Sequence, residues 1–223
     1  MHTTAIIPVK RLESAHERLS EAVPAQERRR LAEAMFRDLL AKIRRSRYID
    51  DAIIVTSDPA AARHARWLDH MVLERDRDAG HSEDASAGAH LAKSRGAERV
   101  VLLPVDCPML DPGELDAHLG DTPRTALIVP DRHGTGTNAL VLCPPDAIQP
   151  AFGPDSCARH ISRARAAGIS FALAQLESLG FDLDTTEDMA ELRDALLLDP
   201  GPAPRTAQVL WELGSPVPPV AAA

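Results

Sequence analysis

The sequence predicts an α/β protein in which a mainly parallel β-sheet is covered by helices on both faces. Two observations lead to this fold class. Short apolar runs alternate with longer segments of helical periodicity along most of the chain, and such alternation is typical of parallel sheets. In addition, 223 residues with 44% hydrophobic content are enough for one ordinary domain with a substantial core.

The predicted strands are the short apolar runs. They cover residues 4–9, 52–56, 70–73, 99–105, 126–129, 138–143, 169–173 and 178–183. The predicted helices lie between them and cover residues 25–45, 59–67, 84–95, 112–119, 155–167 and 186–197. A Gly-rich turn joins the strands at 126–129 and 138–143, so we expect one antiparallel strand in the otherwise parallel sheet.

The domain is expected to cover residues 1–198, followed by a Pro-rich C-terminal tail at 199–223. This tail holds six of the 18 prolines. Such a composition favours a largely disordered segment, with at most one short helix near residues 208–213. We do not expect a second domain.

The composition argues against several functional classes. Aromatic residues make up only 3% of the chain, which disfavours the base-stacking surfaces of single-stranded nucleic-acid binding, and the net charge is −8. Residues 1–47 are basic, with eleven Lys and Arg against six acids; a solvated helix face is the simplest interpretation, and a polyanion site is the alternative.

The cysteines and the N-terminal residues favour a cytoplasmic protein. Cys107, Cys143 and Cys157 are odd in number and lack metal-site spacing, so we expect free thiols in a reducing compartment. There is no apolar run of membrane-spanning length and no signal-peptide pattern. We therefore expect no membrane partner and no nucleic-acid partner.

Two predicted strands end in carboxylates. Asp106 follows the apolar run of VVLLPVDCP, where an uncompensated ion would cost several kcal/mol. Asp182 and Asp184 lie two residues apart in FDLDTTED, and Thr185 or Thr186 then caps the next helix. Two such carboxylates are what Mg²⁺ needs from a protein when phosphate oxygens complete its shell. The alternative is that Asp182 and Asp184 are ordinary turn and capping residues.

Three further segments bear on phosphate binding. In DRHGTGTNALVL the glycines favour a hairpin turn over a phosphate site, because a strand follows and no dinucleotide fingerprint is completed. FGPDSCARH places Asp155 or Ser156 at a helix N-terminus, with Arg159 and His160 in the first turn, which suits a bound phosphate. The loop after the first strand supplies cations that could grip a triphosphate; these are Lys10, Arg11 and Arg18.

Taken together, these motifs resemble the phospholactate and phosphoenolpyruvate guanylyltransferases, known as CofC and FbiD, which act in the biosynthesis of the deazaflavin coenzyme F-420. The segments that carry the resemblance are PVKRLESAHERL, PVDCPML, DRHGTGTNALVL, FGPDSCARH and FDLDTTEDM. It extends from about residue 5 to residue 197. The motifs GTGTNAL and FGPDSCARH, in this order, are highly specific, whereas a strand-end Asp is common to many nucleotidyltransferases.

The resemblance implies a Rossmann-like three-layer sandwich of the nucleotide-diphospho-sugar transferase (GT-A, MobA-like) type. The implied reaction transfers GMP from GTP to the phosphate of a small phosphorylated acid and releases pyrophosphate, and no protein nucleophile is required. The implied roles are Mg²⁺ binding by Asp106, Asp182 and Asp184, a triphosphate clamp of Lys10 and Arg18, and an acceptor site that includes Thr137, Gly153 and Ser156.

The chain departs from the family pattern at two places. His16 stands where the family usually has a second lysine, and a neutral imidazole would weaken the grip on the triphosphate. The segment DAGHSEDASAGAHLAKSRG lacks the Leu-Asn pair that the family commonly has in the region thought to face the base; nearby are Ser82, Ser86 and Gly88.

Several alternatives stay open. The acceptor is phosphoenolpyruvate, 2-phospho-L-lactate or 3-phosphoglycerate, of which the resemblance to bacterial members favours phosphoenolpyruvate, and a downstream transferase would consume the product. A molybdopterin-type nucleotidyltransferase is disfavoured because the Gly-rich loop expected after the first strand is replaced by PVKRLES. A non-catalytic GTP-binding protein would bind GTP without consuming it.

Overall fold

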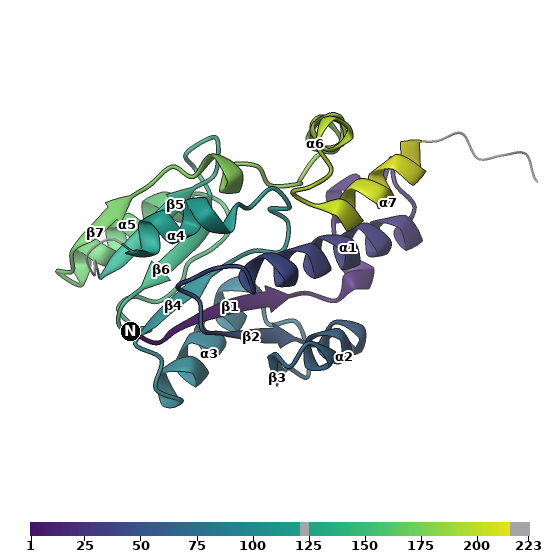
Figure 1. The fold of residues 1–223 in the computed structure, drawn as a ribbon. Helices are drawn as coiled ribbons and strands as arrows, with labels where there is room; N and C mark the ends of the chain where they lie inside the picture. The colour runs from purple at the N-terminus through teal and green to yellow at the C-terminus, as the bar shows by residue number, and fades with distance from the viewer. Residues whose placement is uncertain (121–124, 215–223) are drawn as a thin grey trace, which may run out of the picture.

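The apolar runs assemble into one seven-stranded sheet in the computed structural model, which describes residues 1–120 and 125–214 (Figure 1). The strands are β1 (Thr3–Val9), β2 (Asp51–Thr56), β3 (Met71–Glu74), β4 (Arg99–Leu102), β5 (Ala126–Pro130), β6 (Thr137–Leu142) and β7 (Phe171–Leu173). Their order is β3-β2-β1-β4-β6-β5-β7, and within the described chain β6 alone runs antiparallel to its neighbours. The expected antiparallel strand is confirmed.

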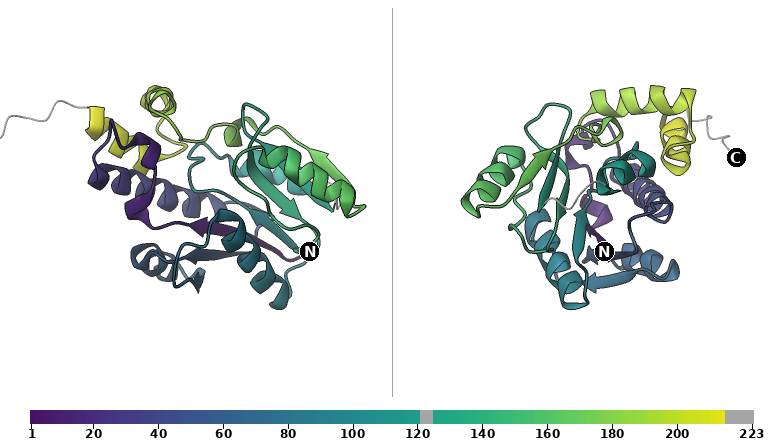
Figure 2. Two further views of the ribbon diagram at one scale, coloured as in Figure 1. Left: turned by 180° about the vertical axis from the view of Figure 1, so that it is seen from behind. Right: turned by 60° about the vertical axis from the view of Figure 1, so that its left-hand side comes forward.

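Helices cover both faces of the sheet, as predicted. They are α1 (Ala25–Ile43), α2 (Pro59–Trp67), α3 (His81–Ser94), α4 (Pro112–Gly120), α5 (Ser156–Ala166), α6 (Thr186–Leu198) and α7 (Pro204–Gly214). One core cluster joins α1, α2 and α4 to one face, and a second joins α3 and α5 to the other, as the right-hand view of Figure 2 shows. No helix in the described ranges has the length and apolar character needed to cross a bilayer.

The basic residues at the start of α1 form hydrogen bonds and an ion pair with nearby groups. Arg28 donates to the carbonyl oxygens of Ala15 and Val23, at 3.3 and 2.8 Å, and Arg29 pairs with Glu13 at 3.3 Å. These pairings agree with the interpretation of the basic segment as a solvated helix face. The three cysteines are free, as predicted.

The end of the chain is more ordered than the predicted tail at 199–223. Helix α7 extends well beyond the short helix expected near 208–213, and its buried residues Val209 and Leu210 join α1 and α6 in a third apolar cluster. The carboxylate of Asp38, buried in α1, accepts hydrogen bonds from the backbone nitrogen and the hydroxyl of Thr206, both at 2.9 Å. The expectation of a largely disordered tail is therefore corrected up to residue 214, and the remainder lies outside the described residues.

The strand predicted at 178–183 is absent from its expected place. The first two residues of this segment belong to a 3₁₀ helix at Glu177–Leu179, and the carboxylate of Glu114 accepts hydrogen bonds from the backbone nitrogens of Glu177 and Ser178, at 2.8 and 3.0 Å. Leu179 and Leu183 are buried in two different apolar clusters. The apolar pattern therefore reflects anchoring side chains in a loop rather than a ladder of strand hydrogen bonds.

The first strand-to-helix loop is held in place by Asp58. One carboxylate oxygen of Asp58 caps α2 by accepting from the backbone nitrogens of Ala60 and Ala61, at 2.7 and 2.9 Å. The other accepts from the backbone nitrogen of Leu12 at 2.9 Å, and Asp58 is only 5% exposed. The loop after β1, which carries Lys10, is thus positioned by the buried side chain of Asp58 in the loop after β2.

We expect Asp58→Ala to lower the free energy of unfolding by about 2–4 kcal/mol, because it leaves three buried amides without an acceptor. Urea denaturation followed by circular dichroism measures this change. Asp58→Asn retains one side-chain oxygen for the helix cap, so its free energy of unfolding should lie between those of Asp58→Ala and the wild type. Equal midpoints for Asp58→Ala and the wild type would contradict this account.

Candidate active site

A cleft of about 340 Å³ opens at the carboxyl edge of the sheet, beside the ends of β1 and β4. The chain leaves β1 toward β2 on one side and returns to β4 on the other, so this is the switch point at which open α/β sheets bind ligands. The cleft is lined by side chains of both loops and of the segment before α6, including Lys10, His16, Arg18, Asp106 and Asp184. The structure therefore brings together most of the residues predicted for metal and triphosphate binding.

The predicted acidic residues interact with one another at this edge. Strand β4 ends at Leu102 because Pro104 has no N–H to continue the ladder. The carbonyl oxygen of Asp106 then accepts from the backbone nitrogen of Leu183 at 3.0 Å, which joins the two acidic segments. Burial, with Asp182 and Asp184 nearby, raises the pKa of Asp106 to about 7.

A second carboxylate of the group is perturbed in the same direction. Burial and the neighbouring Asp184 raise the pKa of Asp182, against a hydrogen bond from the side chain of Asn138. Strand β6 is antiparallel, so its beginning, with Thr137 and Asn138, lies at the edge where the parallel strands end. The reversal of β6 therefore connects the acidic residues to the second predicted site.

The donor set suits a hard divalent cation. Burial is the main cause of the raised pKa values of Asp106 and Asp182, and repulsion between the carboxylates adds to it, so a cation between them would stabilise their charged forms. Among residues 1–120 and 125–214, no three His, Cys, Asp or Glu side chains are arranged to hold a metal ion on their own. Mg²⁺ requires only one or two protein carboxylates when substrate phosphates complete its shell, so these residues fit a Mg²⁺ ion that arrives with a nucleotide.

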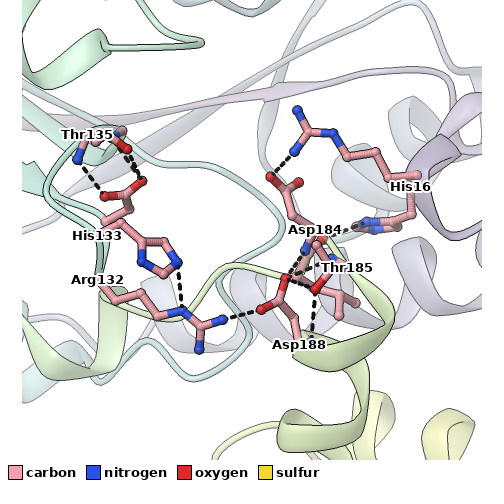
Figure 3. A network of polar contacts seen from close by, with 11 residues as sticks. His16, Arg132, His133, Thr135, Asp184, Thr185 and Asp188 are labelled. Atoms are coloured by element: carbon pink, nitrogen blue, oxygen red, sulfur yellow. Dashed lines mark hydrogen bonds and ion pairs between the residues drawn. The ribbon is translucent and has the colours of Figure 1, made fainter.

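The cationic side of the cleft contains Lys10, Arg18 and His16. Arg18 pairs with Asp184 at 2.5 Å, and both side chains are largely exposed, so this ion pair is easily exchanged for a ligand. Nδ1 of His16 donates to the carbonyl oxygen of Leu183 at 3.2 Å, and burial lowers the pKa of this imidazole (Figure 3). His16 is therefore neutral in the unliganded protein.

The segment that carries Asp182 and Asp184 is fixed by a capping box. Thr185 caps α6, as predicted: the Thr185 hydroxyl accepts from the backbone nitrogen of Asp188, while the Asp188 carboxylate accepts from the backbone nitrogens of Thr185 and Asp184. Arg132, in the loop before β6, forms an ion pair with Asp188 (Figure 3) and a second one with Glu191. These contacts tie the β5–β6 loop to the acidic segment.

The glycine-rich segment forms a hairpin loop, as predicted. Asp131 accepts hydrogen bonds from the backbone nitrogens of Thr135 and Gly136, at 3.0 and 2.8 Å, so these amides are already engaged. Gly134 has a φ of 74°, which glycine adopts without strain. The carbonyl oxygen of Thr135 accepts from the backbone nitrogen of Cys157 at 3.1 Å, which brings the N-terminus of α5 against this loop.

The structure places Thr137, Gly153 and Ser156 around this junction. Ser156 is the first residue of α5, and Asp155 is its N-cap but forms no side-chain capping hydrogen bond. Gly153 has a φ of 103°, so the preceding turn depends on glycine. The backbone nitrogens of Ser156 and Cys157 already donate to the carbonyl oxygens of Gly153 and Thr135, both at 3.1 Å, so the first two amides of α5 are engaged within the protein.

Arg159 and His160, predicted to bind substrate, support the loop before α5. The guanidinium of Arg159 donates to the carbonyl oxygens of Ala151, Phe152 and Pro154. His160 is fully buried and is hydrogen-bonded to Thr137 and to the backbone nitrogen of Ala151. Both residues therefore support the loop before α5, and their part in substrate binding stays a prediction.

Three residues at or near the site were not predicted. His81 lines the cleft, its ring packs edge-on against Phe152 at 4.6 Å between centroids, and burial lowers its pKa to about 4. Nothing in the sequence distinguishes His81 from an ordinary helix start. Asn138 interrupts an apolar strand and Lys42 follows Leu39 on the buried face of α1, so these two positions did carry a signal.

Comparisons with known proteins agree with this geometry. The family described as "Guanylyl transferase CofC like" matches residues 3–203. The chain is 45% identical to a phosphoenolpyruvate guanylyltransferase from Conexibacter woesei, over 96% of this chain and 97% of that protein. It is 30% identical to a 2-phospho-L-lactate guanylyltransferase from Methanothermobacter thermautotrophicus, over 86% of this chain and 84% of that protein.

The fold is also that of solved nucleotide-binding transferases. A putative nucleotide-diphospho-sugar transferase from Desulfovibrio desulfuricans G20 superimposes with a TM-score of 0.76, at 20% identity, with 95% of each chain covered. A CMP:2-keto-3-deoxy-manno-octonic acid synthetase superimposes with a TM-score of 0.60, at 11% identity, over 89% of this chain and all of that one. The predicted fold class is confirmed.

Lys42 supports the loop that carries Asp106, because its buried ammonium donates to the carbonyl oxygen of Pro108. Burial lowers the pKa of Lys42 to about 8. Between about pH 8 and the ordinary lysine pKa, the unfolded chain binds a proton that the folded protein has released, so stability rises with pH.

We therefore expect the unfolding free energy of the wild type, relative to Lys42→Met, to increase by about 1 kcal/mol per pH unit between about pH 8 and 10. Urea titrations of both proteins at several pH values measure this difference. Subtracting the unfolding free energy of Lys42→Met at each pH removes the contributions of the other titrating groups. Parallel curves would show that Lys42 titrates normally.

Proposed function

The chain belongs to the family of CofC-like guanylyl transferases, and from this we propose that it transfers GMP from GTP to the phosphate of phosphoenolpyruvate or 2-phospho-L-lactate in coenzyme F-420 biosynthesis. One observation carries the proposal beyond family membership. Asp106 and Asp184 line the same cleft as Lys10 and Arg18 at the switch point of the sheet, and Asp182 lies close enough to Asp106 to contribute to its raised pKa. This is the arrangement that a nucleotide triphosphate with its metal ion requires.

The reaction follows from the charges in the cleft. An oxygen of the acceptor phosphate attacks the α-phosphorus of GTP, a new P–O–P bond forms, and the bond to the β-phosphate breaks to release pyrophosphate. Two anions must approach each other, so cations are the main requirement and no protein nucleophile is needed.

Each group has a part in this reaction. A Mg²⁺ ion held by Asp106 and Asp184, with Asp182 beside them, would neutralise charge on the reacting phosphates. Lys10 and Arg18 grip the triphosphate and stabilise the leaving pyrophosphate. Arg18 would be free for this role if Asp184 held a metal ion, because the ion pair between Arg18 and Asp184 is solvent-exposed.

The acceptor occupies the second site at the start of β6 and α5. Thr137, Gly153 and Ser156 surround it, and Nδ2 of Asn138 donates to the carbonyl oxygen of Leu179 at 2.7 Å, which ties the start of β6 to the segment that leads to Asp182. Relatives with both printed acceptor names match this chain, and the 45% identical relative favours phosphoenolpyruvate. We place the reaction in the cytoplasm, where a downstream transferase consumes the product.

We expect Asp106→Asn to reduce pyrophosphate release by roughly a hundredfold or more, because it removes a metal-binding charge while the amide occupies the same volume. A coupled pyrophosphate assay with GTP, Mg²⁺ and each of phosphoenolpyruvate, 2-phospho-L-lactate and 3-phosphoglycerate measures this. The matched control is Asp194→Asn, which changes an exposed carboxylate on α6.

Two outcomes would contradict the proposal. Pyrophosphate release by Asp106→Asn at the wild-type rate would contradict the proposal that Asp106 binds the metal ion. Saturable GTP binding by the wild type without consumption in the presence of any of the three acceptors would indicate a nucleotide-binding protein without catalysis.

His16→Lys should lower the KM for GTP several-fold, because it adds a permanent positive charge where the neutral imidazole has none. Steady-state kinetics with varied GTP at a fixed acceptor concentration test this. His16→Gln is the neutral control and should leave the KM for GTP close to that of the wild type. An unchanged or higher KM in His16→Lys would show that position 16 does not face the triphosphate.

A further inference from the structure

The buried imidazole of His160 has a fixed hydrogen-bonding pattern. Its Nε2 lies 2.8 Å from the backbone nitrogen of Ala151, and its Nδ1 lies 3.0 Å from Oγ1 of Thr137. A backbone N–H can only donate, so Nε2 must accept and carries no proton. In a neutral ring the proton is then on Nδ1, and Nδ1 donates to the hydroxyl oxygen of Thr137.

This pattern determines what the hydroxyl of Thr137 can do. Its oxygen accepts the hydrogen bond from His160, and its own hydrogen has no acceptor among the described residues. A hydroxyl can accept and donate at once. The remaining hydrogen of Thr137 is therefore available as a donor to a ligand at the start of β6.

The opposite tautomer would reverse this polarity. With the proton on Nε2, the ring would face the N–H of Ala151 with a second donor. Thr137 would then have to donate to Nδ1 and present lone pairs to the ligand, and an anion would be repelled.

The surroundings of His160 maintain the neutral ring. His160 is fully buried, and the side chains facing it, Arg159 and Arg163, are cationic. Burial and these two guanidinium groups lower the pKa of the imidazole to about 4. Arg163 donates to the carbonyl oxygens of Gln149 and Pro150, so the loop that supplies the N–H of Ala151 is also held from the same helix.

We propose that His160 is a positioning residue that holds the hydroxyl of Thr137 as a hydrogen-bond donor toward an anionic oxygen, phosphate or carboxylate, of the acceptor substrate. This assignment rests on the proposed function, since it requires an anionic acceptor at this site. It gives a specific reason for a buried histidine one turn into α5, where simple capping needs none.

The first test reads the tautomer in the wild-type protein and does not depend on activity. Nitrogen-15 NMR of the imidazole groups, with His160→Phe used for assignment, distinguishes the protonated from the unprotonated ring nitrogen. We expect Nδ1 to be protonated and Nε2 unprotonated at neutral pH. Protonation at Nε2 would overturn the proposal.

The second test separates positioning from a structural role. Thr137→Val should raise the KM for the acceptor by roughly ten- to a hundredfold, the value of a hydrogen bond to a charged group, and leave the KM for GTP nearly unchanged. His160→Phe should also raise the KM for the acceptor. In the Thr137→Val background, however, it should add less than about threefold, because its effect passes through that hydroxyl.

The controls make each failure distinct. Arg165→Gln changes an exposed cation on the same helix, and should leave both KM values within about twofold of the wild type. If His160→Phe raises the KM for the acceptor by the same factor in the wild-type and Thr137→Val backgrounds, His160 only supports the loop. If the wild type releases no pyrophosphate with any acceptor, the proposed function fails and this assignment fails with it; normal turnover with the opposite tautomer removes this assignment alone.

Discussion

The arrangement of the site depends on like charges held together at one edge of the sheet. Asp106 and Asp182 reach this edge from segments far apart in the chain, and the backbone hydrogen bond from Leu183 to Asp106 keeps them adjacent. Burial and, to a smaller extent, this proximity disfavour the charged carboxylates in the unliganded protein and raise the pKa values of both. The proximity persists because capping contacts at α6 and the buried leucines around it determine the path of the chain. A stored repulsion of this kind favours a divalent cation over water.

The reversal of β6 has an equal part in building the site. A seventh parallel strand in its place would have carried Thr137 and Asn138 to the opposite edge, away from the carboxylates. Because β6 runs against β4 and β5, its first residues lie where the parallel strands end. The antiparallel strand therefore places the residues that we propose for acceptor binding beside those that we propose for nucleotide binding.

Much of this architecture could be predicted from the sequence, since buried strands and amphipathic helices leave periodic patterns that do not depend on distant contacts. What could not be predicted is of one kind. The segment at 178–183 has the composition of a strand, but its backbone is bound by Glu114 and by Asp106, partners that only the folded chain reveals. Arg159 has the expected place in the first turn of α5, yet its guanidinium is directed to backbone carbonyl groups. Side-chain direction is decided by tertiary packing, and the residue type alone does not show it.

Helix α7 has a practical consequence for the design of shortened versions of this protein. The Pro-rich composition after residue 198 invites removal before crystallisation. However, Asp38 is 2% exposed and receives its hydrogen bonds from Thr206, and Val209 and Leu210 cover apolar side chains of α1. Removal of the chain from Pro204 onward would leave the buried carboxylate of Asp38 without these hydrogen-bond donors and would expose apolar side chains of α1 to water. A trimmed version should therefore keep the whole of α7.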